Sequence, residues 1–192
     1  MSSVYSIKKR VGETPLEAIR RLRSHNMDLA HVPMTYAGRL DPMASGLLLI
    51  LAGDECKKKE DYLGLDKTYE ATVTFGLTTD SLDLLGVPKL IRTPLLDEAA
   101  IRQAIQNLVG NIELPIPRYA SVIVDGKPSY YWAQQGIKKK QPMRVSHVYS
   151  IDSISISKVS LAELAEAAII LTEAVTGDFR QSEIASIWSD LT

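Results

Sequence analysis

The sequence contains few of the residue types on which metal and disulfide sites depend. Its single cysteine, Cys56, excludes an internal disulfide and a cysteine-ligated metal cluster. The three histidines, His25, His31 and His147, lie far apart in the chain, and none stands at metal-ligand spacing with a cysteine or a carboxylate pair. We therefore expect no metal site.

Long apolar runs are also missing. The most apolar run, residues 47–52, has the length of a strand and falls far short of the roughly 18–20 residues of a membrane helix. The N-terminus, MSSVYSIKKR, has no apolar signal core, which favours a cytoplasmic protein with no membrane attachment. No glycine-rich phosphate loop follows a strand pattern, and no G-x-S-x-G nucleophile motif occurs.

Neither sign of charge dominates, because 22 Lys and Arg residues face 23 Asp and Glu residues, giving a net charge of −1. The whole molecule therefore has no long-range attraction for nucleic acid, although phosphate contacts usually supply much of the affinity for RNA. Positive charge is clustered locally, most clearly at Lys138, Lys139, Lys140 and Arg144. Such a cluster is as often a solvated face as a binding site. Contact with an RNA backbone is the functional interpretation.

The spacing of apolar residues predicts interleaved strands and helices. Alternation predicts strands at residues 4–8, 46–51, 68–75, 119–124, 145–156 and 168–175, the clearest being TYEATVTF at 68–75. Helical spacing and capping boxes predict helices at residues 14–24, 97–109, 127–135, 160–165 and 181–191. Because no βαβ period or repeat is present, we expect an α+β fold: a single mixed, mainly antiparallel sheet with flanking helices, in one domain over residues 1–192.

Aspartates in turns are the remaining candidates for chemistry. Asp41 lies in YAGRLDPMASGLLLI, where a turn of small residues leads into an apolar strand. A carboxylate at such a strand edge can be partly desolvated, and a nearby arginine could keep it ionised. The alternative is that Asp-Pro simply makes a turn. Asp80 and Asp83 are, by the same reasoning, ordinary turn and cap residues.

Several segments, taken in order, resemble the TruB family of pseudouridine synthases. Residues 9–14 (KRVGET) resemble the family's lysine-proline-x-glycine-x-threonine opening, and residues 38–47 (GRLDPMASGL) resemble its nucleophile motif, G-x-L-D-P-x-A-[ST]-G-[LV]. The match continues with DKTYEAT at 66–72, the T-D-x-x-D segment within 76–86, the P-x-[YF]-S-A and G-K-x-x-Y segments within 117–136, and TGDFR at 176–180. The G-R-L-D segment also resembles the RluA family, but the tyrosine and T-D-x-x-D segments after it favour TruB.

This resemblance implies an enzyme that isomerises a uridine in RNA to pseudouridine and needs no cofactor, most commonly in the T loop of tRNA. Asp41 falls on the family's catalytic aspartate. Tyr69 falls on the tyrosine that packs against the target uracil, and Phe179 on the aromatic position beside the nucleophile. Tyr36 stands where many members have histidine, and it is expected to line the same pocket.

The resemblance also implies an arginine that pairs with the nucleophile. The family's arginine position holds Gln181, with Arg180 one place earlier, so either Arg180 or Arg39 is expected to pair with Asp41. We further expect a monomer that acts on RNA as a catalytic domain alone, without the family's C-terminal PUA-type domain.

Two other functions stay open on the sequence alone. A catalytically weak RNA-binding or RNA-folding protein that keeps the TruB fold is suggested by the altered region around Arg180. A small-molecule hydrolase that uses paired aspartates is less favoured, because Asp80 and Asp83 have no site signature of their own.

Overall fold

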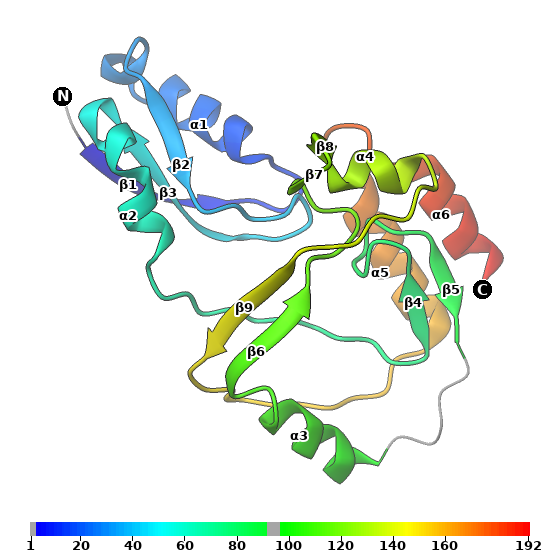
Figure 1. Ribbon diagram of the computed structural model, residues 1–192. Coiled ribbons are helices and arrows are strands. Elements are labelled where there is room, and N and C mark those ends of the chain that lie inside the picture. Colours follow the sequence, from blue (N-terminus) through cyan, green and yellow to red (C-terminus); the bar gives the residue numbers. More distant parts are fainter. Residues whose placement is uncertain (1–2, 92–96) are drawn as a thin grey trace. The chain divides into compact units, whose positions relative to one another are not determined.

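The computed structural model describes residues 3–91 and 97–192. They form two compact units (Figure 1). Unit 1 consists of the residues up to Val73 together with Leu161–Thr192, and unit 2 consists of Thr74–Ser160. Most of the predicted site residues lie in unit 1, and the predicted lysine cluster lies in unit 2.

Unit 1 is built on a three-stranded antiparallel sheet in the order β1-β3-β2. The strands are β1 (Ser3–Lys9), β2 (Met34–Ala37) and β3 (Gly46–Ala52). Helix α1 (Pro15–Ser24) covers one face, where its Ala18 and Ile19 pack on Leu48 and Ile50 (Figure 1). The predicted strands at 4–8 and 46–51 are therefore confirmed.

The start of α1 is fixed by its first residues. The Thr14 side chain accepts a hydrogen bond from the Glu17 amide at 3.2 Å, and Glu17 Oε2 accepts one from the Thr14 amide at 2.7 Å. This reciprocal pair is a capping box, and Pro15 needs no hydrogen-bond acceptor at the first helical position. The predicted N-terminus of the helix is confirmed.

Two helices complete unit 1, after the short segments η1 (Met27–Leu29), η2 (Gly53–Lys58) and α2 (Lys59–Leu63). They are α5 (Leu161–Glu173) and α6 (Gln181–Asp190). The predicted strand at 168–175 is wrong, because residues 168–173 belong to α5 and the last two residues form no strand. Buried Ala165, Ala168 and Thr172 are spaced three and four residues apart, which is the period of a helix face.

The segment predicted as the clearest strand, residues 68–75, is neither strand nor helix in the structure. Its side chains are exposed, with Tyr69 at 71% and Val73 at 73%. An alternating pattern indicates only a preference for extended backbone. A β-strand forms when its amides and carbonyls make hydrogen bonds with a neighbouring strand. Among the described residues no strand pairs with this segment.

In the part of unit 2 that the structure describes, residues 74–91 and 97–160, there are three two-stranded antiparallel sheets and two helices. The elements are β4 (Leu77–Thr79), β5 (Pro88–Leu90), α3 (Glu98–Gln106), β6 (Gly110–Pro115), β7 (Ile123–Val124), β8 (Lys127–Pro128), α4 (Ser129–Gln134) and β9 (Met143–Val148). The predicted strand at 145–156 stops at Val148, because its partner β6 begins opposite it at Gly110. Of the strand predicted at 119–124, only β7 forms.

The fold class is α+β, as predicted, and every strand pair in the described ranges is antiparallel. Helices α3, α4 and α6 are found where the sequence placed helices. Over residues 3–91 and 97–192, no helix has the length and apolar character needed to span a membrane.

Candidate active site

The predicted nucleophile lies in the connection between β2 and β3. The backbone of Asp41 makes a turn, in which its carbonyl accepts a hydrogen bond from the Ala44 amide at 2.9 Å. The side chain is exposed, and its carboxylate makes no hydrogen bond or ion pair with any residue that the structure describes. The turn thus uses only the backbone of Asp41 and leaves the carboxylate accessible to a substrate.

A buried lysine anchors the loop that carries Asp41. Lys9, at the end of β1, is 0% exposed, and its Nζ donates to the carbonyls of Arg10 at 3.0 Å, Pro42 at 3.3 Å and Ala44 at 2.6 Å. Burial lowers the pKa of the Lys9 ammonium, while the negative charges of nearby Glu13 and Asp41 oppose that shift. Three carbonyl acceptors satisfy the three protons of the ammonium group.

A glycine joins this loop to a distant part of the chain. The Gly12 amide donates to the Pro42 carbonyl at 2.9 Å, and the Gly12 carbonyl accepts from the Thr176 amide at 3.2 Å. Gly12 has a φ of +80°, and a Cβ at this position would overlap the carbonyl of Ala174. Only glycine fits here, so the backbone of a single residue bridges residues 42 and 176.

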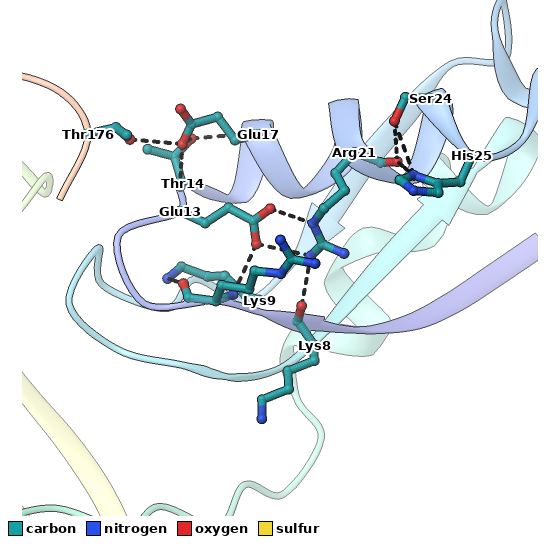
Figure 2. Close-up of polar contacts among 10 residues, drawn as sticks. Lys8, Lys9, Glu13, Thr14, Glu17, Arg21, Ser24, His25 and Thr176 are labelled. Atoms are coloured by element: carbon teal, nitrogen blue, oxygen red, sulfur yellow. Dashed lines mark hydrogen bonds and ion pairs between the residues drawn. The ribbon is translucent and has the colours of Figure 1, made fainter. Parts of the chain in front are cut away.

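The turn before α1 is stabilised by an ion pair (Figure 2). Arg21 Nε lies 2.7 Å from Glu13 Oε1, and Arg21 Nη2 donates to Glu13 Oε2 at 3.0 Å and to the Lys8 carbonyl at 2.8 Å. The hydrogen bond from Arg21 holds the pKa of Glu13 below its ordinary value. The bidentate pair ties α1 to the end of β1, next to Lys9.

The segment that carries Phe179 and Arg180 is a closed turn. Gln181 Oε1 accepts from the Phe179 amide at 2.9 Å, and Gln181 Nε2 donates to the carbonyls of Val175 at 3.1 Å and Gly177 at 2.6 Å. Gln181, at the position where the family's arginine was expected, thus stabilises its own turn. Arg180 precedes α6 in the left-handed conformation, with φ at 61°. Its pairing with Asp41, or that of Arg39, stays a prediction.

The two predicted tyrosines have different surroundings. Tyr36, in β2, packs partly against the core beside Ile50, and Lys59 Nζ lies 5.5 Å from its ring centroid. Tyr69 is exposed in the connection that follows α2. Tyr69 is therefore not a core residue, and its ring is accessible for stacking.

The predicted lysine cluster is divided by its contacts. Lys138, Lys140 and Arg144 are exposed. Lys139 instead pairs with Asp125 at 2.9 Å, and its Nζ lies 4.6 Å from the centroid of the Trp132 ring. Lys139 thus belongs to the packing of the β7–β8 hairpin against α4, and the other three are available to a ligand.

Asp80 and Asp83 accept hydrogen bonds from backbone amides nearby in the chain, as turn residues do, and Asp80 also accepts one from a distant tyrosine. Asp80 accepts hydrogen bonds from the Val87 amide at 2.8 Å and from the Tyr119 hydroxyl at 3.1 Å, and Asp83 Oδ1 accepts one from the Leu85 amide at 2.9 Å. Within the described part of the chain, no group of three or more His, Cys, Asp or Glu residues is arranged to hold a metal ion.

Comparison with known sequences identifies the family. Residues 29–168, which include Asp41 and Tyr69, match the family described as TruB family pseudouridylate synthase (N terminal domain). The chain belongs to the TruB family.

Curated relatives carry the name tRNA pseudouridine synthase B. The chain is 33% identical over 155 residues to the one from Caldicellulosiruptor saccharolyticus, and the match covers 81% of this chain and 53% of the relative. It is 36% identical over 162 residues to the one from Bordetella avium, where the match covers 82% of this chain and 64% of the relative. The chain thus spans about half to two thirds of the length of these TruB relatives.

Four residues of the site have contacts that the sequence did not reveal: Lys9, Gly12, Thr176 and Gln181. The sequence could have indicated the role of Lys9, because strand alternation places Lys9 on the same inward face of β1 as Tyr5 and Ile7. A charge on that face is unfavourable without hydrogen-bond partners. The other three had none, since their partners are distant in the chain or depend on the turn geometry. All four lie outside the residues matched to the TruB family.

Proposed function

We propose that the protein is a pseudouridine synthase that converts a uridine in RNA to pseudouridine, with Asp41 as the catalytic residue. The family membership supports this class of reaction. The observation that carries the proposal is an exposed Asp41 carboxylate on a loop anchored by the buried ammonium of Lys9. A carboxylate held in this way is accessible, and its backbone is fixed before substrate arrives.

The reaction is an isomerisation. The bond between the ribose and uracil N1 breaks, the base turns over, and a new bond forms to C5, while one proton leaves C5 and one is gained at N1. Atoms and electrons balance within the nucleotide, so the proposal includes no cofactor and no metal. Asp41 either attacks the nucleotide or stabilises and deprotonates the ribose.

The aromatic residues are proposed to hold the base. A uridine in folded RNA must be extruded to be reached, which costs a few kcal/mol and is easiest in loops that are already unstacked. Tyr69, with its exposed ring, is proposed to stack on the extruded uracil, and Phe179 and Tyr36 to line the pocket. Arg180 or Arg39 is proposed to keep Asp41 ionised.

The proposed substrate is a uridine in the T loop of tRNA. The names of the relatives support tRNA as the class of RNA. The exposed cations Lys138, Lys140 and Arg144 are proposed to contact the phosphate backbone. We also propose that residues 1–192 act as one catalytic domain, as a monomer in the cytoplasm.

The test is a comparison of three proteins on an unmodified tRNA transcript, with pseudouridine mapped by position. Wild type is expected to form pseudouridine in the T loop. Asp41→Asn keeps the size of the side chain and removes its charge, so turnover is expected to fall far more than tenfold, with the thermal transition unchanged. Asp28→Asn, an exposed aspartate of η1 in the same unit, is the matched control and is expected to behave as wild type.

Three outcomes are informative. Turnover by Asp41→Asn within tenfold of wild type, a loss below about 1.4 kcal/mol of transition-state stabilisation, would refute the assignment of Asp41. Pseudouridine at another position would refute the T loop alone. Tight binding of the transcript by wild type without any pseudouridine would replace the enzyme with an RNA-binding protein of the TruB fold.

A further inference from the structure

The hydroxyl of Thr176 joins the turn that carries Phe179 and Arg180 to the segment around the start of α1, and that segment contacts the Asp41 loop through Gly12. Thr176 Oγ1 lies 2.9 Å from Glu17 Oε2 (Figure 2). It also lies 3.1 Å from the Gly12 carbonyl. It has one proton, and the shorter, charge-assisted bond to the carboxylate is the stronger of the two. The contact spans 159 residues of sequence within unit 1.

Glu17 receives this bond in addition to its role at the start of α1. Its Oε2 also accepts from the Thr14 amide at 2.7 Å and from the Thr14 hydroxyl at 2.8 Å. The bonds from Thr14 lower the pKa of Glu17, and the bond from Thr176 acts in the same direction. The carboxylate is therefore charged at neutral pH and held in one place by three donors.

Thr176 is connected both to the loop that carries Asp41 and to the turn that carries Phe179 and Arg180. On one side, the Gly12 amide holds the Pro42 carbonyl, next to Asp41. On the other side, Thr176 lies within the closed turn in which Gln181 binds the backbone of Val175, Gly177 and Phe179. Because that turn is internally bonded, a shift of Thr176 moves Phe179 with it.

We propose that Thr176 is a positioning residue, whose hydroxyl, donating to Glu17 beside the Gly12 carbonyl, sets where the Phe179–Arg180 turn lies relative to the Asp41 loop. The inference rests on the proposed function, because the turn and the loop carry the groups assigned to uridine. It extends the site to residues outside the part of the chain matched to the TruB family, residues 29–168.

The variant that tests it is Thr176→Val, which keeps the shape of the side chain and removes the hydroxyl. Thr176→Ser keeps the hydroxyl. Thr192→Val is the matched control, since the Thr192 hydroxyl donates to the Ser189 carbonyl at its own helix end, at 3.1 Å. Each protein is measured for thermal stability, RNA affinity and single-turnover rate of pseudouridine formation.

A small displacement of reacting groups is expected to change the chemical step and not the affinity. Thr176→Val is expected to lower the single-turnover rate by about tenfold to a hundredfold, with RNA affinity and melting temperature close to wild type. Thr176→Ser is expected to restore most of the rate. Thr192→Val is expected to match wild type in all three measurements.

A double-variant cycle with Glu17→Gln tests the pair itself. If the hydroxyl acts through the carboxylate, the rate losses of Glu17→Gln and Thr176→Val are expected to be less than additive when combined. Additive losses, or a loss in Thr176→Ser equal to that in Thr176→Val, would overturn the proposal. So would a single-turnover rate in Thr176→Val equal to that of wild type.

Hydrogen exchange separates this proposal from the proposed function. In Thr176→Val, faster amide exchange is expected in peptides covering residues 10–17 and 175–181, but not in those covering α4 in unit 2. Absence of pseudouridine in wild type would refute the proposed function, whatever the exchange shows. Unchanged exchange in Thr176→Val would refute the contact itself, whether or not wild type is an enzyme.

Discussion

Replacing Lys9 with methionine tests the anchor of the Asp41 loop. Methionine keeps an unbranched apolar chain and removes the ammonium, so three carbonyls lose the hydrogen bond from Lys9. Arg10 is exposed, so its carbonyl can be hydrated, and the Pro42 carbonyl keeps the Gly12 amide as a donor. The carbonyl of half-buried Ala44 is left without a donor, and a buried acceptor without a partner costs about 1–3 kcal/mol.

That loss of unfolding free energy should be visible in the melting temperature. For a chain of this size, 1 kcal/mol corresponds to a shift of about 2–4 °C, so Lys9→Met is expected to melt roughly 2–12 °C below wild type. Lys8→Met is the matched control, because Lys8 is the neighbouring residue of β1 and is exposed. An exposed substitution usually changes stability by under about 0.5 kcal/mol, so this control is expected to melt within about 2 °C of wild type.

The same pair of variants reports on the loop. With the anchor gone, residues 41–46 are expected to exchange their amide hydrogens faster in Lys9→Met and at the wild-type rate in Lys8→Met. Pseudouridine formation, measured well below the melting temperature of each variant, is expected to fall only in Lys9→Met. Equal melting temperatures for the two variants would show that the ammonium contributes nothing to the loop, and the reasoning would be refuted.

Three further predictions concern binding and pH. Tyr69→Ala is expected to leave the melting temperature unchanged, since the ring is exposed. It is expected to lower turnover by about 5- to 150-fold through the loss of about 1–3 kcal/mol of stacking, while Tyr69→Phe retains activity. A large loss of stability at equal turnover would contradict this. Replacing Lys138 and Lys140 with glutamine is expected to lower the slope of log affinity against log salt by about 0.9 units per lost phosphate contact. Lys139→Gln is expected mainly to lower stability, because Lys139 pairs with Asp125 and lies over the Trp132 ring. Salt slopes identical to wild type would show that the cluster is a solvated face. The pKa of Glu13 is lowered on folding, so its ion pair stabilises the folded protein fully above the ordinary pKa of 4.5, and this stabilisation is lost as pH falls through the folded pKa. Glu13→Gln is therefore expected to flatten the acid-induced fall in melting temperature. An unchanged pH profile of the melting temperature would refute the contribution of Glu13.

The sequence predicted best those elements whose determinants are local. The capping box of Thr14 and Glu17 and the alternation in β1 lie within a few residues, and both predictions were confirmed. The strand predicted at 168–175 was wrong because its β-branched residues were considered without the residues before them. The helix begins at Leu161, and its buried residues keep a helical period through Thr172.

The failed strand at 68–75 has a different cause. Its residues have the alternation and the β-branched side chains that favour strands, and nothing in the local pattern argues against one. A strand also needs a partner, and a partner is a property of the whole chain. The prediction was therefore sound about backbone preference and wrong about structure.

The candidate site divides in the same way. The placement of Asp41 in a turn before an apolar strand was visible in the sequence. The support beneath that turn was not, because the Gly12 amide reaches Pro42 and the Gly12 carbonyl reaches Thr176, far along the chain. Hydrogen bonds of backbone groups carry no side-chain signature, so a glycine that bridges two segments cannot be told from a glycine in an ordinary turn until both neighbours are seen.

Gln181 shows how a departure from a family's pattern can be understood from contacts. An amide has both a donor and an acceptor, and Gln181 uses the acceptor for the Phe179 amide and the donor for the carbonyls of Val175 and Gly177. A guanidinium has only donors and could not accept from the Phe179 amide. Arginine at this position would leave the Phe179 amide without this acceptor, so the cation proposed to pair with Asp41 is better supplied from a neighbouring position.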